Sequence, residues 1–578
     1  MTGSRTKWWR VFAVVAALAL IGAACGDDDD DSSSDTGEET TTGEETAGED
    51  AAAEETAGEE TTGGEAAAGG QFIDYGTFVG DPPEHLDPHL NSTLDAYQVI
   101  NAVYDGLTEI DASDPADPQI VPLVAESYEP NEDASVWTFQ IRDDAVFSNG
   151  DPITATTFQK SWERAADLAG DYSYLLTFID GGDERLAGEA DIISGVEADD
   201  ATRTLTVTLN APYSNFDAVV GFQLFFPVPE EAITAGAEWE NSAMYGNGPY
   251  VLEAPRNDQE IILVPNENWQ GDFEGNTWDD RLTQIIFRVQ SDPDTSYNAF
   301  EAGEGDNANI PAGRIAQAQE EYGTTLDDTI LGSYHFVING RDERIGGPEN
   351  LKLRQAVSAA IYRETINEAV YNGSRTVSTG VVPAGIPGFQ EGICEYCAYD
   401  EAQAATLFQE WQDEGGVQDG PLPIQFNADA GHEPVIAIML DNLAAVGIEA
   451  EAQPFPSETY FSQLADGACV ICRAGWFADY PTYDNFMFDL FHSSALDGNN
   501  YGFVNEEFDA LVDEAKQTTD ADAQGELFRQ SEQILLNTDT HAIPVNWYRG
   551  DYAYDDTRFA DFVQSNGIIY WERIQVVG

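Results

Sequence analysis

The amino-acid sequence predicts an α/β protein built on several non-contiguous sheets. Segments that alternate apolar and polar residues, as half-buried strands do, interchange with segments that repeat apolar residues at helical spacing. No repeat of fixed period runs along the chain. Of its 578 residues 42% are hydrophobic, and the region 71–578 is far longer than the roughly 250–300 residues at which one core stops growing. Two or three domains are therefore expected.

Strand and helix signals alternate in the first half of this region. We expect strands at 71–79 and 136–142 and a helix at 96–107. The Asn-Gly pair at 149–150 is typical of a hairpin turn, and Thr154 is placed to cap the helix that follows it. Further strands are expected at 203–209 and 260–266.

Helices become more frequent in the second half. A broad apolar face, which includes Ala356 and Val357, predicts a helix over 351–371. The helical stretch 433–447 ends at Gly447, a residue type common just past helix ends. A strand is expected at 448–455, and helices at 506–516 and 523–537.

The chain is strongly acidic. It has 106 Asp and Glu against 24 Lys and Arg, a formal net charge of -82, which excludes a nucleic-acid partner because phosphate binding needs a basic surface. Residues 26–70 hold 17 acids, no base and no large apolar side chain, and this composition predicts a disordered acidic tether. Residues 71–578 still carry a net charge of -68. Their acidity fits either adaptation to salt or attraction of cationic ligands.

The N-terminus has the pattern of an export signal. Arg5, Lys7 and Arg10 precede the apolar run 11–24, which is too short to span a membrane and ends at Cys25. The residues before Cys25 resemble the lipobox of bacterial lipoproteins, in which the cysteine is lipidated and becomes the new N-terminus. We therefore predict a lipoprotein signal peptide over 1–25, with ordinary cleavage as the alternative.

Four further cysteines form two C-x-x-C pairs, Cys394 with Cys397 and Cys469 with Cys472. Export favours disulfides over a structural zinc site, and the span between the pairs is too long for a compact zinc module. Three connectivities remain open. If Cys469 and Cys472 both lay on a strand, their Cα atoms would be about 10 Å apart, which would favour cross-pairing. A turn at Cys469 would instead allow the local bridge.

No enzyme signature is present. The sequence lacks a G-x-S-x-G elbow, an H-E-x-x-H motif and a Walker loop, so neither catalysis nor a cofactor is expected. Six His residues are scattered along the chain. His85, Asp87 and His89 lie close together in HLDPHL, which leaves metal capture there as an alternative to structural roles.

Several segments in order along the chain carry a family resemblance. They include LDPHLNSTLDAYQVINAVYDGLTEID, VPLVAESYEP, WTFQIRDDAVFSNGDPITATTFQKSWER, NGPYVLEAPRNDQEIILVPNENWQG, LKLRQAVSAAIYRETI, RAGWFADYPTYDNF and FDALVDEAKQTTD. In this order they resemble the solute-binding proteins of ABC importers for oligopeptides and dipeptides, extracellular receptor family 5. The resemblance covers essentially all of 71–578.

The resemblance implies a two-lobed periplasmic-binding-protein-like fold of class II, in its large three-domain variant, with a ligand cleft between the lobes. Lobe 1 is then discontinuous and consists of 71–104, 228–331 and 549–578. A domain inserted in lobe 1 covers 105–227, and lobe 2 covers 332–548. Such a receptor closes on its ligand by hinge motion.

The segment RAGWFADYP contains the residues that the resemblance assigns to the ligand. Asp479 would receive the α-amino group of a peptide and Arg473 its carboxylate, while the backbone of Gly475, Trp476 and Phe477 would pair with the peptide main chain. Six residues separate Arg473 from Asp479, so on an extended chain both point to one side. A structural salt bridge between the two is the alternative, and Trp476 could equally be core.

The opposite wall of the cleft is expected to contain Thr93, Leu94 and Asp95. Tyr172 and Tyr174 stand where the family often has a ligand-facing Tyr, although plain packing is an alternative for both.

Together these features predict a lipid-anchored monomeric receptor on the extracytoplasmic face of a bacterial membrane. It would capture short peptides and deliver them to the permease and ATPase of an importer. The alternative is a sensory or chaperone-like lipoprotein of the same fold that binds another amine-bearing solute.

Overall fold

The computed structural model describes residues 70–80, 82–111, 119–271, 280–322, 325–428, 431–456, 459–460, 464, 469–495, 501–562 and 564–577. The predicted signal peptide, with Cys25, and the predicted tether up to residue 69 lie outside the described residues. Within the described ranges, no helix is both long and apolar enough to cross a bilayer.

The largest sheet in the described part of the chain has 11 strands. Its main path runs β15 (Ala450–Phe455), β14 (Leu422–Asn427), β16 (Ile471–Phe477), β12 (Thr325–Ile338), β17 (Ala542–Tyr554), β11 (Asn307–Asn309), β1 (Gln71–Asp74), β10 (Gln284–Arg288), β9 (Glu260–Pro265) and β8 (Tyr250–Leu252). β13 (Thr376–Val377) pairs with β17 off this path.

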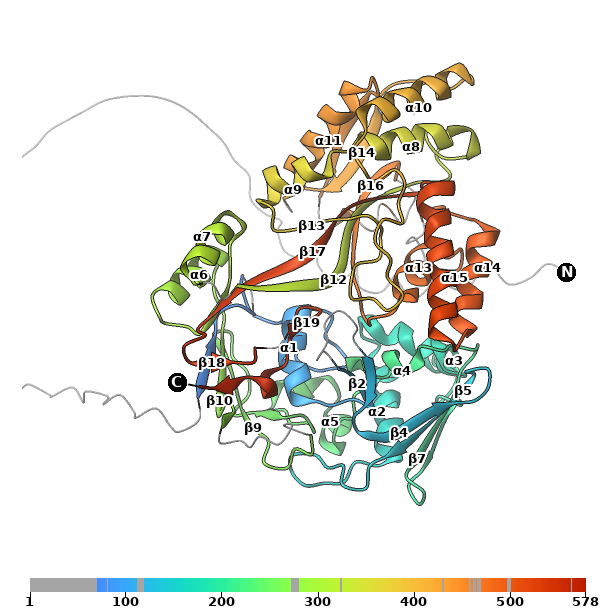
Figure 1. Ribbon diagram of the computed structural model, residues 1–578. Helices are drawn as coiled ribbons and strands as arrows, with labels where there is room; N and C mark the ends of the chain where they lie inside the picture. The colour runs from blue at the N-terminus through green and yellow to red at the C-terminus, as the bar shows by residue number, and fades with distance from the viewer. Residues whose placement is uncertain are drawn as a thin grey trace, which may run out of the picture. The chain divides into compact units, whose positions relative to one another are not determined.

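β12 and β17 form the centre of this sheet. They have 14 and 13 residues, pair antiparallel and lie side by side in Figure 1. At one end β12 also pairs with β16, and Phe336 and Ile543 are buried in one core. At the other end β17 pairs with β11, and Ala553 packs with Tyr297 in a separate core. The two strands therefore connect the β16 side of the sheet with the β1 side.

A second sheet follows the order β4 (Ala125–Pro130), β5 (Val136–Ile141), β7 (Thr204–Thr208) and β6 (Val196–Asp199). It shares a core with α2 (Ala155–Leu168), which buries Phe158 and Trp162 on one face. As predicted, Thr154 precedes this helix in a capping box with Thr157. The Asn-Gly pair also forms a turn, with Gly150 at a φ of 87°.

The remaining elements surround these two sheets. The helices are α1 (Leu94–Val103), α3 (Gly182–Leu186), α4 (Phe216–Val219), α5 (Glu230–Ala235), α6 (Pro293–Glu301), α7 (Ile315–Glu321), α8 (Leu351–Ala360), α9 (Arg363–Tyr371), α10 (Glu401–Asp413), α11 (Glu433–Ala445), α13 (Asp484–Phe491), α14 (Glu506–Gln517) and α15 (Ala521–Gln533). Small two-stranded sheets join β2 (Thr108–Asp111) to β3 (Gln119–Pro122), β18 (Phe559–Ala560) to β21 (Gln575–Val576), and β19 (Gln564–Ser565) to β20 (Ile568–Ile569).

The stretch 351–371 is two helices rather than one. α8 ends at Ala360, and the backbone N–H of Tyr362 donates to Asn442 Oδ1 (2.9 Å) instead of continuing the helix. The buried Arg363 guanidinium donates to the carbonyl oxygens of Ser358 and Ile361, both at 3.1 Å. These bonds satisfy carbonyls that the helix end would otherwise leave free, so the break is stabilised by side chains that lie outside the apolar pattern.

Buried apolar residues gather into separate clusters. One cluster draws on residues between Leu107 and Phe225, together with Tyr480. A second combines residues from Phe72 to Tyr104, from Phe226 to Phe287 and from Phe559 to Ile574, and two more lie between Leu331 and Tyr548. This segregation favours the domain division expected from the sequence, which stays a prediction.

Both disulfides are local, Cys394 to Cys397 and Cys469 to Cys472. The cross-pairing that a strand conformation would favour is therefore wrong. β16 begins only at Ile471, so Cys469 lies before the strand, and the Cα atoms of Cys469 and Cys472 are 5.6 Å apart.

The HLDPHL motif anchors α2 instead of collecting metal ligands. Asp87 accepts two hydrogen bonds from Arg164, and the side chains of both residues are almost fully buried. His89 Nε2 donates to Phe226 O, while His89 Nδ1 faces Arg164 Nη1 at 2.8 Å and accepts from it. Burial lowers the pKa of His89 to about 4, which keeps the ring neutral. Among the described residues no cluster of three or more metal-ligating side chains is present.

Breaking this buried ion pair should destabilise the protein. Arg164→Met leaves the Asp87 carboxylate buried without its cation, and the free energy of unfolding is expected to fall by about 3–5 kcal/mol. Lys160→Met is the matched control, because its ion pair with Glu230 is exposed and is worth at most about 1 kcal/mol. Urea denaturation followed by Trp fluorescence measures both variants, and equal losses would contradict the structural role of the pair.

Candidate functional site

One edge of β16 is open over most of its length. Along its other edge, β16 pairs with β12 from Ile471 to Phe477. β14 pairs only with Ile471 and Cys472, so from Arg473 onward the second edge has no partner strand among the described residues. An open edge of this kind can accept an extended peptide as an added strand.

Asp479 follows the end of β16 and holds a half-buried carboxylate. Its Oδ2 accepts hydrogen bonds from Tyr174 Oη (3.1 Å) and from Asn485 Nδ2 (3.3 Å), and its backbone N–H donates to Asn485 Oδ1 (3.1 Å). Burial raises the pKa of Asp479 to about 6, although the two donated hydrogen bonds act in the opposite direction. The carboxylate is thus positioned by neutral donors and has no cation beside it in the described part of the chain.

Both candidate tyrosines lie near this carboxylate. They come from the short helix η2 (Asp171–Phe178), which brings Tyr174 to Asp479. Tyr172 packs edge-on against Phe222 with ring centroids 4.7 Å apart. Burial raises the pKa of each hydroxyl, and the charge of Asp479 raises it further. Tyr174 therefore contacts Asp479 directly, whereas Tyr172 contributes packing.

Arg473 lies among aromatic rings rather than beside a carboxylate. Its Nη2 donates to Tyr548 Oη (3.4 Å), and its guanidinium carbon is 5.1 Å from the centre of the Tyr334 ring. Its Nε is buried and has no hydrogen-bond partner among the residues that the structure describes. Arg473 and Asp479 form no ion pair with each other, so the structural salt bridge considered from the sequence is wrong.

A second arginine, Arg375, shares the Tyr548 ring. Its guanidinium carbon is 5.1 Å from the ring centre, and its Nη1 donates to Arg549 O (3.2 Å). β13 brings Arg375 there, because Thr376 pairs with Trp547 of β17. Sequence reasoning missed this residue, since no spacing or motif relates Arg375 to Arg473.

The three candidate residues between Arg473 and Asp479 differ in their surroundings. A Cβ added to Gly475 would lie 2.6 Å from Tyr548 Oη, so a larger residue here would displace the Tyr548 hydroxyl. Trp476 is half-buried against a core, and its Nε1 donates to Asn485 Oδ1 (2.8 Å). Phe477 is 53% exposed and stacks on Tyr548 with centroids 4.6 Å apart.

The expected opposite wall, Thr93 to Asp95, lies at the start of α1. Leu94 is 40% exposed and reaches the turn at Gly567, where an added Cβ would be 3.1 Å from Leu94 Cδ2. The neighbouring Asn566 donates to Ala478 O (3.3 Å) and accepts from the backbone of Leu331 (2.9 Å). This turn therefore connects the start of α1 with the residue before Asp479.

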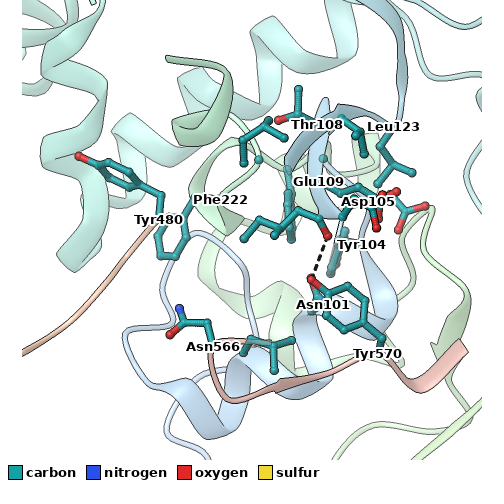
Figure 2. A pocket seen from close by; sticks show the side chains of 18 of the residues that line it. Asn101, Tyr104, Asp105, Thr108, Glu109, Leu123, Phe222, Tyr480, Asn566 and Tyr570 are labelled. Carbon is teal, nitrogen blue, oxygen red and sulfur yellow. Dashed lines mark hydrogen bonds between the residues drawn. The ribbon is translucent and has the colours of Figure 1, made fainter. Parts of the chain in front are cut away.

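A cavity of about 280 Å³ adjoins Asp479 (Figure 2). α1 contributes Tyr97 and Asn101 to it, and β2 contributes Glu109. Tyr570, from the C-terminal segment, also lines the cavity, and its hydroxyl donates to Ile110 O (3.1 Å). The helical spacing of Tyr97 and Asn101 could have suggested a shared face, but nothing in the sequence indicated that the C-terminal segment closes over it.

Removing the Tyr174 hydroxyl should change the acidity of Asp479. Donated hydrogen bonds stabilise a carboxylate, so Tyr174→Phe is expected to raise the pKa of Asp479 further above about 6. A carbon-13 NMR titration of the carboxyl group measures the change. Tyr172→Phe is the control, because Tyr172 packs on Phe222 and should leave that pKa nearly unchanged. Equal shifts in the two variants would count against the assigned contact.

Comparison with known proteins agrees with this architecture. Residues 119–498 match the family described as bacterial extracellular solute-binding proteins, family 5 Middle. The oligopeptide-binding protein OppA of Bacillus subtilis is 24% identical over 507 residues, which cover 85% of this chain and 90% of that protein.

Solved structures give the same fold. The unliganded open form of the murein tripeptide-binding protein MppA has a TM-score of 0.74 at 23% identity, covering 88% of this chain and 97% of that chain. Haemophilus influenzae OppA in complex with the peptide RPPGFSPFR has a TM-score of 0.67 at 23% identity, covering 88% and 99% of the two chains. With the family match over more than half of its length, the chain belongs to family 5 of the bacterial extracellular solute-binding proteins.

Proposed function

We propose that this protein is an extracytoplasmic receptor that binds short peptides in a cleft between two lobes and delivers them to the permease of an ABC importer. The observation that carries the proposal is the open edge of β16, with an uncompensated arginine near its start and a carboxylate just beyond its end. A peptide in extended conformation has a cationic amine, an anionic carboxylate and a main chain that needs partners. The site offers one group for each of these parts.

Asp479 is the acceptor for the amine. A ligand ammonium would supply the positive charge that the half-buried carboxylate lacks, and its attraction would favour the ionised form. Tyr174 and Asn485 hold the carboxylate in place through their hydrogen bonds. Binding of the amine would therefore need little reorganisation of the site.

Arg473 is the hydrogen-bond donor for the carboxylate, and Arg375, which contacts the same Tyr548, lies close enough to assist it. A guanidinium that stacks on aromatic rings keeps its donors free for a planar carboxylate. The unpartnered Nε of Arg473 is one such donor. Between the two ends, the exposed Phe477 and the backbone from Gly475 would contact the peptide main chain.

Lobe closure fits the predicted domain division. β12 and β17 cross between the proposed lobes, which suits a hinge with more than one chain crossing. Hydrogen bonds connect the proposed inserted domain with lobe 2. Tyr213 Oη donates to Asp484 Oδ2, and Asn215 Nδ2 donates to Asp484 Oδ1 (2.7 Å). The backbone N–H of Ser214 donates to Lys516 O (2.8 Å). These contacts would hold the two lobes together around a ligand.

The known relatives support peptides as the ligand class and an extracytoplasmic location. OppA of Bacillus subtilis is named an oligopeptide-binding protein. The structure of Haemophilus influenzae OppA contains the peptide RPPGFSPFR. We further propose that a lipid on Cys25 anchors the protein and that the acidic tether 26–70 keeps the folded part away from anionic headgroups.

The role of Asp479 is tested by titrating the purified full chain with tri- to pentapeptides in a calorimeter, each with a free or an acetylated amino group. The unmodified protein is expected to bind the free-amine forms about 10- to 100-fold more tightly, because a charge-assisted hydrogen bond is lost on acetylation. Asp479→Asn should abolish this preference.

Asp258→Asn is the matched control, since Asp258 is exposed and distant in sequence from the site. It should keep the preference for a free amine. No heat with any peptide would overturn the proposed function, and a preference that survives Asp479→Asn would overturn the assigned residue.

Lipidation at Cys25 is tested by metabolic labelling with a radioactive fatty acid in a bacterial host. The unmodified protein should incorporate label and sediment with membranes, whereas Cys25→Ser should lose the label because the serine cannot form the thioether. Ser33→Ala, in the predicted tether, should label normally. A labelled Cys25→Ser protein would contradict the anchor.

A further inference from the structure

The cavity beside Asp479 is walled by α1, by the strands β2 and β3 that follow it, and by the C-terminal segment, which is far from them in sequence. α1 supplies Tyr97, Asn101 and, just past its end, Tyr104, while β2 and β3 supply a second side. The C-terminal segment from Asn566 to Arg573 covers a third side (Figure 2). Asp479 lines the same cavity, so a group bound at its carboxylate has direct access to this space.

Carboxylates dominate the polar lining of the cavity. Asp105 accepts a hydrogen bond from Trp269 Nε1 (2.8 Å), and Glu572 lies 3.7 Å from the Nε of its neighbour Arg573. The side chain of Glu109 makes no hydrogen bond or salt bridge with the described residues, and its one attractive charge there is that of Arg573. With Asp111 and Asp479, five acids therefore line one cavity, whose lining contains a single guanidinium, that of Arg573.

Ionising these buried carboxylates costs free energy, because burial removes them from water. Burial, with a smaller contribution from the charge of Glu572, raises the pKa of Glu109 to about 7, although the charge of Arg573 acts in the opposite direction. The pKa values of Asp105 and Glu572 are also raised, in both cases mainly by burial. A cation inside the cavity would offset the desolvation of these carboxylates and the repulsion between Glu109 and Glu572.

The aromatic walls suit an organic cation better than a metal ion. Tyr97 packs near Phe222 with centroids 5.8 Å apart, and Tyr104 stacks near Phe226 at 6.4 Å. Such rings can contact the methylene groups of a long side chain, and their faces attract an ammonium or guanidinium head. The cavity volume of about 280 Å³ is close to that of the smallest small-molecule pockets and leaves room for one side chain.

We propose that this cavity is a cation subsite for the side chain of a Lys or Arg at the N-terminal position of the bound peptide. The inference rests on the proposed function, because Asp479 both lines the cavity and is the proposed acceptor for the peptide's amine. Once the amine is held there, the side chain of the same residue is the part of the ligand nearest the cavity. Glu109, whose side chain makes no hydrogen bond or salt bridge with the described residues, is the residue that would contact the cationic head.

The test compares two peptides that differ only in the terminal ammonium group of one side chain, Lys-Ala-Ala and norleucine-Ala-Ala, by calorimetry with the full chain. The lysine peptide is expected to bind about 10-fold more tightly, since its ammonium gains a charge-assisted hydrogen bond in the cavity. Glu109→Gln should reduce this ratio to near one while leaving the affinity for norleucine-Ala-Ala unchanged. Glu129→Gln, an exposed acid on β4, is the control and should keep the full ratio.

Glu572→Gln is a second variant, which keeps the test valid if Glu109→Gln does not fold. It should also reduce the ratio of the affinities for the lysine and norleucine peptides. Equal binding of the two peptides to the unmodified protein, or a ratio that survives both substitutions, would overturn the cation subsite while leaving peptide binding intact. Failure of both peptides to bind would overturn the proposed function and this inference together.

Discussion

The antiparallel ladder between β12 and β17 is the constraint on which the rest of the structure depends. Along its second edge, each of the two strands pairs with different neighbours. β12 pairs with β16, whose end leads into Asp479, whereas β17 pairs with β13, which brings Arg375 beside Tyr548. Further along, β17 continues through β11 to β1. The register of this ladder therefore sets where Arg375, proposed to assist at the carboxylate end of a ligand, lies relative to β16 and Asp479.

Much of this architecture was predictable because it is encoded locally. Alternation and helical spacing predicted β5 and α2 together with the Thr154 cap, and the segment around Asp479 was found from its family resemblance. Local patterns do not report contacts between distant segments. The break before Arg363 depends on Asn442 and on carbonyl groups, and neither contributes to an apolar pattern.

The same reasoning explains which parts of the site were missed. Arg375 meets Tyr548 only because two strands pair, and the cavity exists only because the C-terminal segment lies against α1 and β2. The pairing of Cys469 with Cys472 depended on where β16 begins, since a difference of two residues decides whether the sulfur atoms can meet. Predictions that required a strand boundary or a tertiary contact were the ones that sequence could not make.

The hydrogen bonds from Tyr213, Ser214 and Asn215 to residues near the C-terminal helices have a consequence for selectivity. None of the residues that make them is proposed to contact the ligand, so in the proposed receptor they would contribute the same free energy to closure whichever peptide is bound. A ligand then shifts the population of closed molecules only by the difference between its affinities for the closed and the open conformation. A receptor that already favours closure can accept many weakly distinguished peptides, and its discrimination rests on the few charged groups that contact each one.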